Sequence, residues 1–363
     1  MINFKLLLFV IIFYSTMVGC RVKINPELHK AIETNKYKKA LSILHKGTNI
    51  NAVSRYNETA LILAASKMIT SHDKKNALEW YSFINVLLDK NADLSIRTRQ
   101  GYHLLHFIVR SIYIKGEKLL SLTEKIISLG GDINVQTNYG QTPLHYAVQR
   151  RNSAYVDFLI KKGAKVSLKN KNGDTPINRY LRYNQNENIK IYNLLIQAGA
   201  KINHQNSSGT SALMINTLLG YNKIIQFLIS KGAKVNLQDA LGKSVLMHAV
   251  QFHHPKTVSL LLLNKADVFQ KDKKGNTALH WTLIAEKKYR KIISLMGKNK
   301  VVSVMEKMLT DKKKKWLLIA RMLIKKKADL SQKNKDGETV LSMAKRFENK
   351  EMIKLITQNS FLK

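Results

Sequence analysis

Three histidines lie close together in the second half of the chain, at His248, His253 and His254. Imidazoles at short spacing can hold zinc when three or four ligands converge. No H-E-x-x-H motif occurs here, no carboxylate adjoins the cluster in sequence, and the single cysteine of the chain rules out a Cys-based zinc site. We therefore expect packed or partly exposed histidines, no metal site and no cofactor.

A fragment of a phosphate-binding motif occurs just before these histidines, in the stretch ALGKS at residues 240–244. A complete P-loop begins with a glycine five residues before the Gly-Lys-Ser end, and Leu237 stands at that position. The chain also lacks a recognisable Ser/His/Asp arrangement and any conspicuous pair of carboxylates. We expect a protein that is not an enzyme and has no small-molecule substrate.

The charge of the chain is strongly basic, with 61 Lys and Arg against 24 Asp and Glu and a net charge of +37. Only 12 of the basic residues are arginine, the side chain that binds phosphate best because its planar fork is bidentate. Two explanations stay open. Lys, Asn and Ile are enriched together and share AT-rich codons, or the charge serves binding to polyanions or anionic membranes.

The only cysteine, Cys20, follows an apolar N-terminal segment. Lys5 precedes an unbroken apolar run over residues 6–13, and the small residue Gly19 comes directly before the cysteine, as in a secretory signal. A helix over residues 6–19 would measure about 21 Å, shorter than the hydrocarbon core of a bilayer. An ordinary cleaved signal or a short uncleaved anchor is compatible with this layout.

The segment Met17-Val18-Gly19-Cys20 resembles the lipobox of bacterial lipoproteins, although its first two residues are looser than the common pattern. The resemblance implies cleavage of residues 1–19, lipidation of Cys20 and a short tether over residues 20–24. Two or three acyl chains would anchor the protein durably at a membrane. We expect a membrane-anchored protein of the bacterial cell envelope, on its periplasmic or surface face, with secretion as the alternative.

Most of the remaining chain repeats itself. A glycine-led frame restarts at Gly140, Gly173, Gly209, Gly242 and Gly275, at intervals of 33, 36, 33 and 33 residues, and again 62 residues later at Gly337. Weaker copies begin at Asn57 and Gly101, and a degenerate copy begins near residue 25. A fixed period of this length indicates stacked units that bury one continuous core.

The frame resembles the ankyrin repeat, through Thr142-Pro143-Leu144-His145 near the start of a unit and Gly232-Ala233-Lys234-Val235-Asn236 near its end. The resemblance implies an all-α fold, a solenoid of about nine helix–turn–helix units over residues 25–363 joined by short β-turn fingers. It also makes His106, His145 and His280 structural residues that hydrogen-bond loop backbone.

Individual residue types fit this frame. Thr142 and Ser211 can cap a first helix, and Pro143 suits its first position. Gly163, Gly199 and Gly232 follow the second helices, where a left-handed residue closes a helix. Asn91, Lys265 and Lys327 stand at the same place in other units, and we expect the two lysine corners to be strained or differently shaped.

Three units depart from the regular length. Those from Asn57 and Gly101 run 44 and 39 residues, which suggests extended inter-helix loops. The unit from Gly275 carries an insertion at about residues 286–321, which includes four lysines at 312–315. The insertion predicts a lengthened helix pair with the lysines in a solvated loop, or an amphipathic helix that touches anionic lipid.

In proteins of the ankyrin family, partners usually contact the turn tips and the ends of the first helices, which together form a concave face. The resemblance therefore implies a protein-binding scaffold whose partner would contact Arg110, Tyr139, Gln149, Arg150, Arg182, Tyr183, Leu241, Gln251, Phe252, Lys273 and Lys274. Large side chains at exposed positions are typical anchors of an interface, although scattered surface hydrophobes are also normal.

Overall fold

The computed structural model describes residues 26–54, 56, 58–179, 185–295 and 300–360, without the side chains of residues 187 and 300–303. The predicted signal segment and Cys20 lie outside these residues. The chain divides into two compact units at residues 165 and 166. Within the described residues, no helix combines the length and the apolar character needed to span a bilayer.

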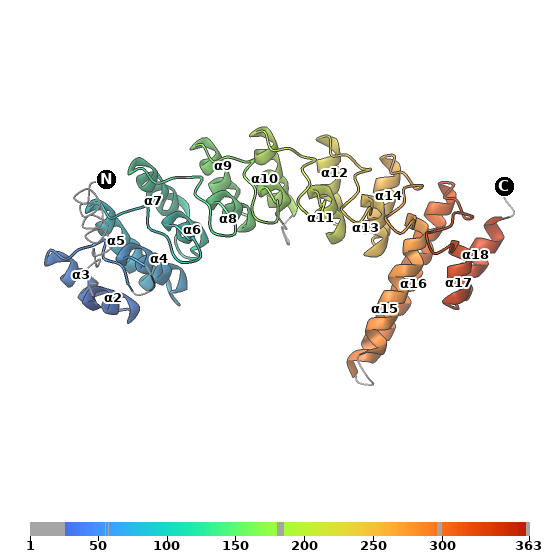
Figure 1. Cartoon of the computed structure of the whole chain (residues 1–363), viewed down its shortest axis with the longest axis horizontal. Helices are drawn as coiled ribbons and strands as arrows, with labels where there is room; N and C mark the ends of the chain where they lie inside the picture. The colour runs from blue at the N-terminus through green and yellow to red at the C-terminus, as the bar shows by residue number, and fades with distance from the viewer. Residues whose placement is uncertain (1–25, 55, 57, 180–184, 296–299, 361–363) are drawn as a thin grey trace, which may run out of the picture. The chain divides into compact units, whose positions relative to one another are not determined.

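The described part of the first unit consists of successive helix pairs, and the second of these pairs is the longest (Figure 1). Its helices are α2 (Pro26–Glu33), α3 (Tyr37–His45), α4 (Ala60–Thr70), α5 (Lys74–Asp89), α6 (Leu104–Arg110), α7 (Gly116–Ser128), α8 (Pro143–Gln149) and α9 (Ser153–Lys161). First helices pack on first helices, α2 on α4, α4 on α6 and α6 on α8, so that apolar faces too small to form a core alone are buried between neighbours.

The second unit continues the same pattern and ends in a helix pair. It contains the 3₁₀ turn η1 (Pro176–Asn178), α10 (Gln185–Gln197), α11 (Ala212–Leu219), α12 (Asn222–Ser230), α13 (Val245–Gln251), α14 (Pro255–Leu263), α15 (Ala278–Ser294), α16 (Lys300–Lys325), α17 (Val340–Arg346) and α18 (Lys350–Ser360). The first helices α11, α13, α15 and α17 pack in one row and α10, α12, α14, α16 and α18 in a second row. In the described residues, extended structure is limited to isolated bridges such as Gln238–Ser244, so the predicted all-α fold is confirmed.

Each regular repeat opens with a tight turn that we call a finger. A finger is a five-residue segment with Gly as its fourth residue. In the finger Asp272–Asn276, the Asp272 N–H donates to the Asn276 carbonyl at 2.9 Å, and the Asp272 carboxylate accepts from the N–H groups of Lys274 and Asn276 at 2.8 and 2.9 Å. The side chain therefore holds the turn closed from inside. The same hydrogen bonds recur at Asn170, Asn206, Asp239 and Asn334.

The helix termini form as their residue types require. The Thr142 hydroxyl accepts from the His145 N–H, and the Ser211 hydroxyl accepts from the Met214 N–H, so both predicted N-caps are confirmed. The glycines that close second helices have positive φ, as at Gly232 (91°). Lys265 and Lys327 adopt the same left-handed conformation at φ 62°, so these corners keep the shape of the others and carry the strain of a β-carbon.

Two predictions of loops in the irregular repeats are wrong. In the unit from Asn57, only residues 71–73 separate α4 from α5, and the additional residues lengthen the helices to 11 and 16 residues. In the insertion, the predicted lengthened helix pair is correct, but residues 312–315 lie inside α16 instead of in a loop. Figure 1 shows α15 and α16 continuing well beyond the ends of α13 and α17.

Candidate partner-binding surface

Finger tips and first-helix ends form one continuous side of each unit, which we call the finger face. In the second unit, backbone hydrogen bonds join each finger to the next. The Ala240 N–H donates to the Ser208 carbonyl at 3.0 Å, the Lys273 N–H to the Leu241 carbonyl at 2.9 Å, and the Lys335 N–H to the Lys274 carbonyl at 2.9 Å. Because the fingers are tied at this fixed spacing, the side chains at their tips are held at defined positions.

The first unit brings four of the predicted contact residues to its finger face. Tyr139 stands at a finger tip and is 57% exposed. Gln149 ends α8, and Arg150, also exposed, follows it as the C-cap residue. Arg110 ends α6, is half-buried and lies over the rings of Tyr102 and Tyr146, at 5.2 and 5.8 Å from their centroids.

Both arginine side chains, Arg110 and Arg150, already form contacts within this unit. The Arg150 guanidinium donates to the Ser111 carbonyl at 3.2 Å, and partial burial together with the nearby Arg110 charge lowers its pKa. Arg110 is attracted to the electron-rich faces of two tyrosines. The cluster therefore presents a positively charged aromatic surface, whereas Tyr139, at 57% exposed, extends a large side chain into solvent.

The second unit places the remaining described residues at matching positions. Leu241, at a finger tip, is 62% exposed, and Phe252, at the C-cap of α13, is 37% exposed. Gln251 is half-buried, and its side-chain carbonyl accepts from Lys243 Nζ at 2.9 Å. Lys273 and Lys274 are exposed on the next finger. The predicted residues Arg182 and Tyr183 lie outside the described residues.

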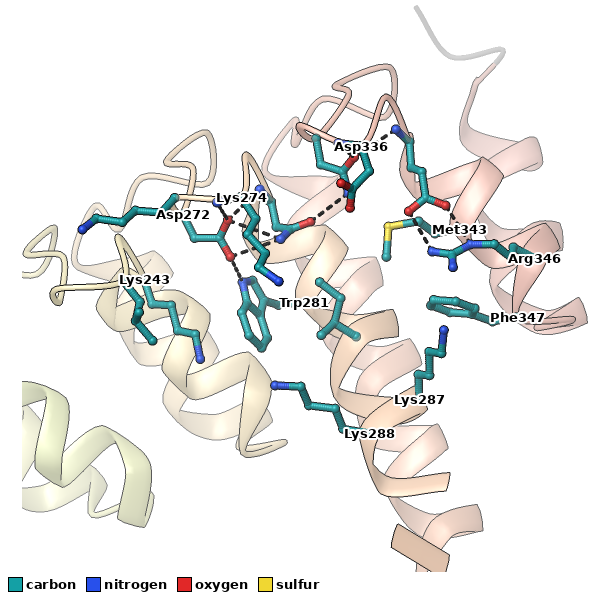
Figure 2. Close-up of a pocket in the computed structure, with 16 residues that line it drawn as sticks. Lys243, Asp272, Lys274, Trp281, Lys287, Lys288, Asp336, Met343, Arg346 and Phe347 are labelled. Atoms are coloured by element: carbon teal, nitrogen blue, oxygen red, sulfur yellow. Dashed lines mark hydrogen bonds and ion pairs between the residues drawn. The ribbon is translucent and has the colours of Figure 1, made fainter. Parts of the chain in front are cut away.

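Leu241, Lys273 and Lys274 line one pocket of about 420 Å³ in the second unit (Figure 2). The pocket lies between α15 and α17, and residues of three successive fingers line its upper edge. Its apolar surface comes from Trp281, Ile284, Met343 and Phe347. This volume is within the usual range for pockets that bind small ligands or a few side chains.

Sequence reasoning missed most of this pocket. Lys243, Trp281, Lys287, Lys288 and Phe347 line it, and none was predicted as a contact residue. Trp281 is 4% exposed, and its Nε1 donates to the Asp272 carboxylate at 2.9 Å. The available signal was the 62-residue interval after Gly275, which indicated that the two walls of this site differ from their counterparts.

The histidine cluster is a packing feature in this structure. His248 Nε2 lies 2.9 Å from an Asp239 carboxylate oxygen, so a carboxylate that does not adjoin the cluster in sequence contacts it in the fold. His254 Nε2 donates to the Leu218 carbonyl at 3.0 Å, and the His253 ring packs on Trp316. Burial, together with the charge of Lys312, lowers the pKa of His253 to about 4. Across the described residues, no three His, Cys, Asp or Glu side chains converge as a metal site would require.

The structural histidines occupy the predicted positions. His106 Nε2 donates to the Gln141 carbonyl at 3.0 Å, and His280 Nε2 donates to the Glu338 carbonyl at 3.3 Å, each in the following finger. His145 Nδ1 lies 2.8 Å from the Thr142 hydroxyl and completes a capping box. These side chains tie the start of one helix to the next turn, so they belong to the fold.

The tight fingers, the capped seven-residue first helices and the left-handed closing residues define a class of helical repeat protein. A model of the ankyrin repeat family matches residues 105–206, 180–272 and 213–305, together more than half of the chain. The chain belongs to the ankyrin repeat family. Ankyrin repeats are typically non-enzymatic scaffolds that bind other proteins, and protein binding is the class of function that this fold supports.

Several known sequences are similar to parts of the chain. A putative ankyrin repeat protein of Rickettsia bellii is 40% identical over 110 residues, which cover 29% of this chain and 59% of that protein. A putative ankyrin repeat protein of fowlpox virus is 28% identical over 168 residues, 40% of this chain and 37% of that protein. The chain thus spans less than two thirds of the length of these relatives.

Among solved structures, the ankyrin repeat domain of Bcl-3, a member of the IkappaB protein family, has a similar fold. The TM-score is 0.52 with 22% sequence identity, over 70% of this chain and 97% of that domain. At this identity the likeness concerns the fold alone.

Proposed function

We propose that this chain is a non-enzymatic scaffold that binds a protein partner through its finger face, and that a lipidated Cys20 tethers it to a bacterial envelope membrane. The observation that carries the first part is the exposure of Tyr139, Leu241 and Phe252 at finger tips and first-helix ends. Large side chains at such positions bury much apolar area on binding and so dominate the energy of an interface.

Removing two of these anchors tests the finger face. We expect Leu241→Ala combined with Phe252→Ala to lower partner recovery in a crosslinking pull-down about tenfold, which corresponds to about 1.4 kcal/mol of binding free energy. The matched control is Leu263→Ala with Phe269→Ala, because these side chains are 74% and 55% exposed but lie at and after the end of a second helix. Equal recovery from both double variants would remove the finger face from the proposal.

A second candidate function is binding to polyanions or anionic membranes. It is favoured by the α15–α16 hairpin, where Ile292, Leu295, Val304 and Met308 are between 47% and 75% exposed among basic residues. The salt dependence of the same pull-down distinguishes the two functions. If the logarithm of recovery falls steeply and linearly with the logarithm of the salt concentration, the contacts are with phosphates. A defined protein complex depends on salt much less.

The tether has its own test, mass spectrometry of the mature N-terminus. We expect the mature chain to begin at Cys20 and to carry the mass of a diacylglyceryl group with or without a third acyl chain, because two or more chains are needed for durable anchoring. Cys20→Ala should move the protein from the membrane fraction to the soluble or unprocessed fraction. Support comes from the lipobox-like segment and from similarity to a bacterial ankyrin repeat protein. A mature chain with an unmodified Cys20 would exclude the tether and leave the scaffold in place.

A further inference from the structure

The insertion in the unit from Gly275 builds one wall of the pocket beside Trp281. α13 and α17 each have seven residues, whereas α15 between them has 17. Lys287 and Lys288 therefore lie in a part of α15 for which the neighbouring first helices have no counterpart. Both line the pocket, so the site exists because α15 continues past the normal end of a first helix.

Two lysines approach the same indole ring in this pocket (Figure 2). Lys243 Nζ is 4.0 Å and Lys288 Nζ is 5.3 Å from the centroid of the Trp281 ring. Within the part of the chain that the structure describes, neither ammonium group forms an ion pair with a carboxylate. Burial, and then the positive charge of Lys288, lower the pKa of Lys243. An anion placed between the two lysines would relieve that repulsion.

The carboxylates of the pocket are engaged with other groups, and the charges of Asp239 and Asp272 only partly offset the lowered pKa of Lys243. Asp272 accepts from Trp281 Nε1 at 2.9 Å and from its own finger, and Glu338 forms an ion pair with Arg346 at 2.7 Å. Asp336 is exposed at a finger tip. The lining residues include five lysines and one arginine against three carboxylates, so the pocket has a net positive charge.

An apolar slot adjoins the charged part of the pocket. Ile284, Met343 and Phe347 line it, and the Phe347 ring is flanked by Lys287 Nζ at 4.5 Å and by the Arg346 guanidinium at 4.6 Å. Cations on an aromatic face leave room at its edge for an apolar or aromatic ligand side chain. The site thus pairs a place for negative charge with a place for an apolar side chain within one pocket.

We propose that this pocket binds an acidic linear peptide segment of the protein partner, with a carboxylate between Lys243 and Lys288 and an apolar side chain against Phe347. The proposal deepens the scaffold function and rests on it. A peptide suits the pocket better than a nucleic acid, because the slot lined by Ile284, Met343 and Phe347 can hold an apolar side chain, which a phosphate backbone does not offer.

A synthetic peptide tests the site. The probe is N-acetylated Asp-Glu-Phe-Asp-Glu amide, titrated by isothermal calorimetry into the purified full-length chain and compared with Asn-Gln-Phe-Asn-Gln and with Asp-Glu-Ala-Asp-Glu. We expect the acidic peptide to bind at least tenfold more tightly than the neutral one. Lys243→Gln with Lys288→Gln should weaken its binding about tenfold, because charge-assisted contacts are lost. The control Lys223→Gln with Lys256→Gln removes two exposed lysines from second helices and should change affinity less than twofold.

The apolar slot is tested separately by Phe347→Ala. We expect this variant to weaken the Phe-containing peptide about fivefold and to leave the Ala-containing peptide within twofold of wild type. Equal affinities for acidic and neutral peptides, an unchanged affinity in the Lys243/Lys288 variant, or single-stranded RNA that displaces the peptide at equal concentration would each overturn the proposal. If the pocket variants fail to bind the peptide yet recover the cellular partner normally, the pocket is not the partner site, and the scaffold function stands.

Discussion

Replacing Gly209 with alanine is expected to destabilise the second unit by about 3 kcal/mol. Gly209 is the fourth residue of its finger and has φ +71°, a conformation in which a β-carbon costs about 1–2 kcal/mol. An added β-carbon would also lie 2.4 Å from the Ala240 nitrogen and 2.7 Å from the Asp239 carbonyl carbon. Both are backbone atoms of the next finger, so neither can rotate away.

The clash falls on the hydrogen bond that joins the two fingers. The Ala240 N–H donates to the Ser208 carbonyl at 3.0 Å, directly beside Gly209. Relieving the contact requires the fingers to separate, and then that bond and the spacing of the finger tips are both disturbed. We therefore expect the loss of stability to extend to the repeat that follows, since each repeat is stabilised by its neighbours.

Gly232→Ala is the matched control for this prediction. Gly232 has φ +91°, but a β-carbon there would meet nothing within 4 Å. Lys265 occupies the equivalent corner of the next unit at φ 62°, which shows that a side chain fits. Urea unfolding should give a loss of only about 1 kcal/mol for this variant. Equal losses for Gly209→Ala and Gly232→Ala would show that backbone strain, and not the finger contact, accounts for the whole effect.

The repeat frame predicted residues whose roles depend on their own unit. Thr142 and Ser211 cap helices, and Gly163 and Gly232 close them, because these roles follow from backbone geometry within a few residues. The finger-tip position of Leu241 followed from the same frame. Such local rules repeat with the period, so a sequence alone is enough to apply them.

The pocket could not be predicted in this way, because its wall belongs to the insertion. No repeat landmark indicates whether residues after 285 continue the helix or enter a loop. One local signal was available. Glu286 and Arg290 are four residues apart, and in α15 the carboxylate of Glu286 accepts from Arg290 at 2.6 and 3.0 Å, a pairing that favours helix. Asp311 likewise stands four residues before Lys315, the same favourable spacing, so the expectation of a solvated loop at residues 312–315 overlooked a helix signal, and these lysines lie inside α16.

The stability of the first unit is expected to fall by about 2 kcal/mol between pH 7 and pH 5 through His106 alone. Burial, followed by the nearby charges of His103 and Arg97, lowers the pKa of His106 to about 4. The unfolded chain binds the proton near pH 6.5, so it takes up protons first as the pH falls. Stability from this group is therefore complete above about pH 6.5 and decreases as the pH falls toward 4.

The hydrogen bonds of His106 explain why its neutral form is required. Its Nδ1 accepts from the His103 N–H at 3.0 Å, while Nε2 donates to the Gln141 carbonyl at 3.0 Å. Protonation of Nδ1 would place its new N–H group opposite the His103 N–H, and neither donor would then have an acceptor there. A buried donor without an acceptor costs about 1–3 kcal/mol, of the same order as the expected loss.

His106→Asn should remove this share of the pH dependence and keep the fold. The chain itself supplies the precedent, because Asn178 holds the same position in the unit from Gly173, where its Oδ1 accepts from the Thr175 N–H at 3.3 Å and its Nδ2 donates to the Thr210 carbonyl at 3.2 Å. Hydrogen-exchange protection of α6, corrected for the intrinsic pH dependence of exchange, should fall between pH 7 and 5 in the wild type and clearly less in His106→Asn, where buried His103 still contributes. His45→Asn, at an exposed position in the same unit, should behave as wild type. A variant His106→Asn that lost protection as steeply as the wild type would assign the acid sensitivity to other groups, and the neutral histidine would then serve only as a link between helix and finger.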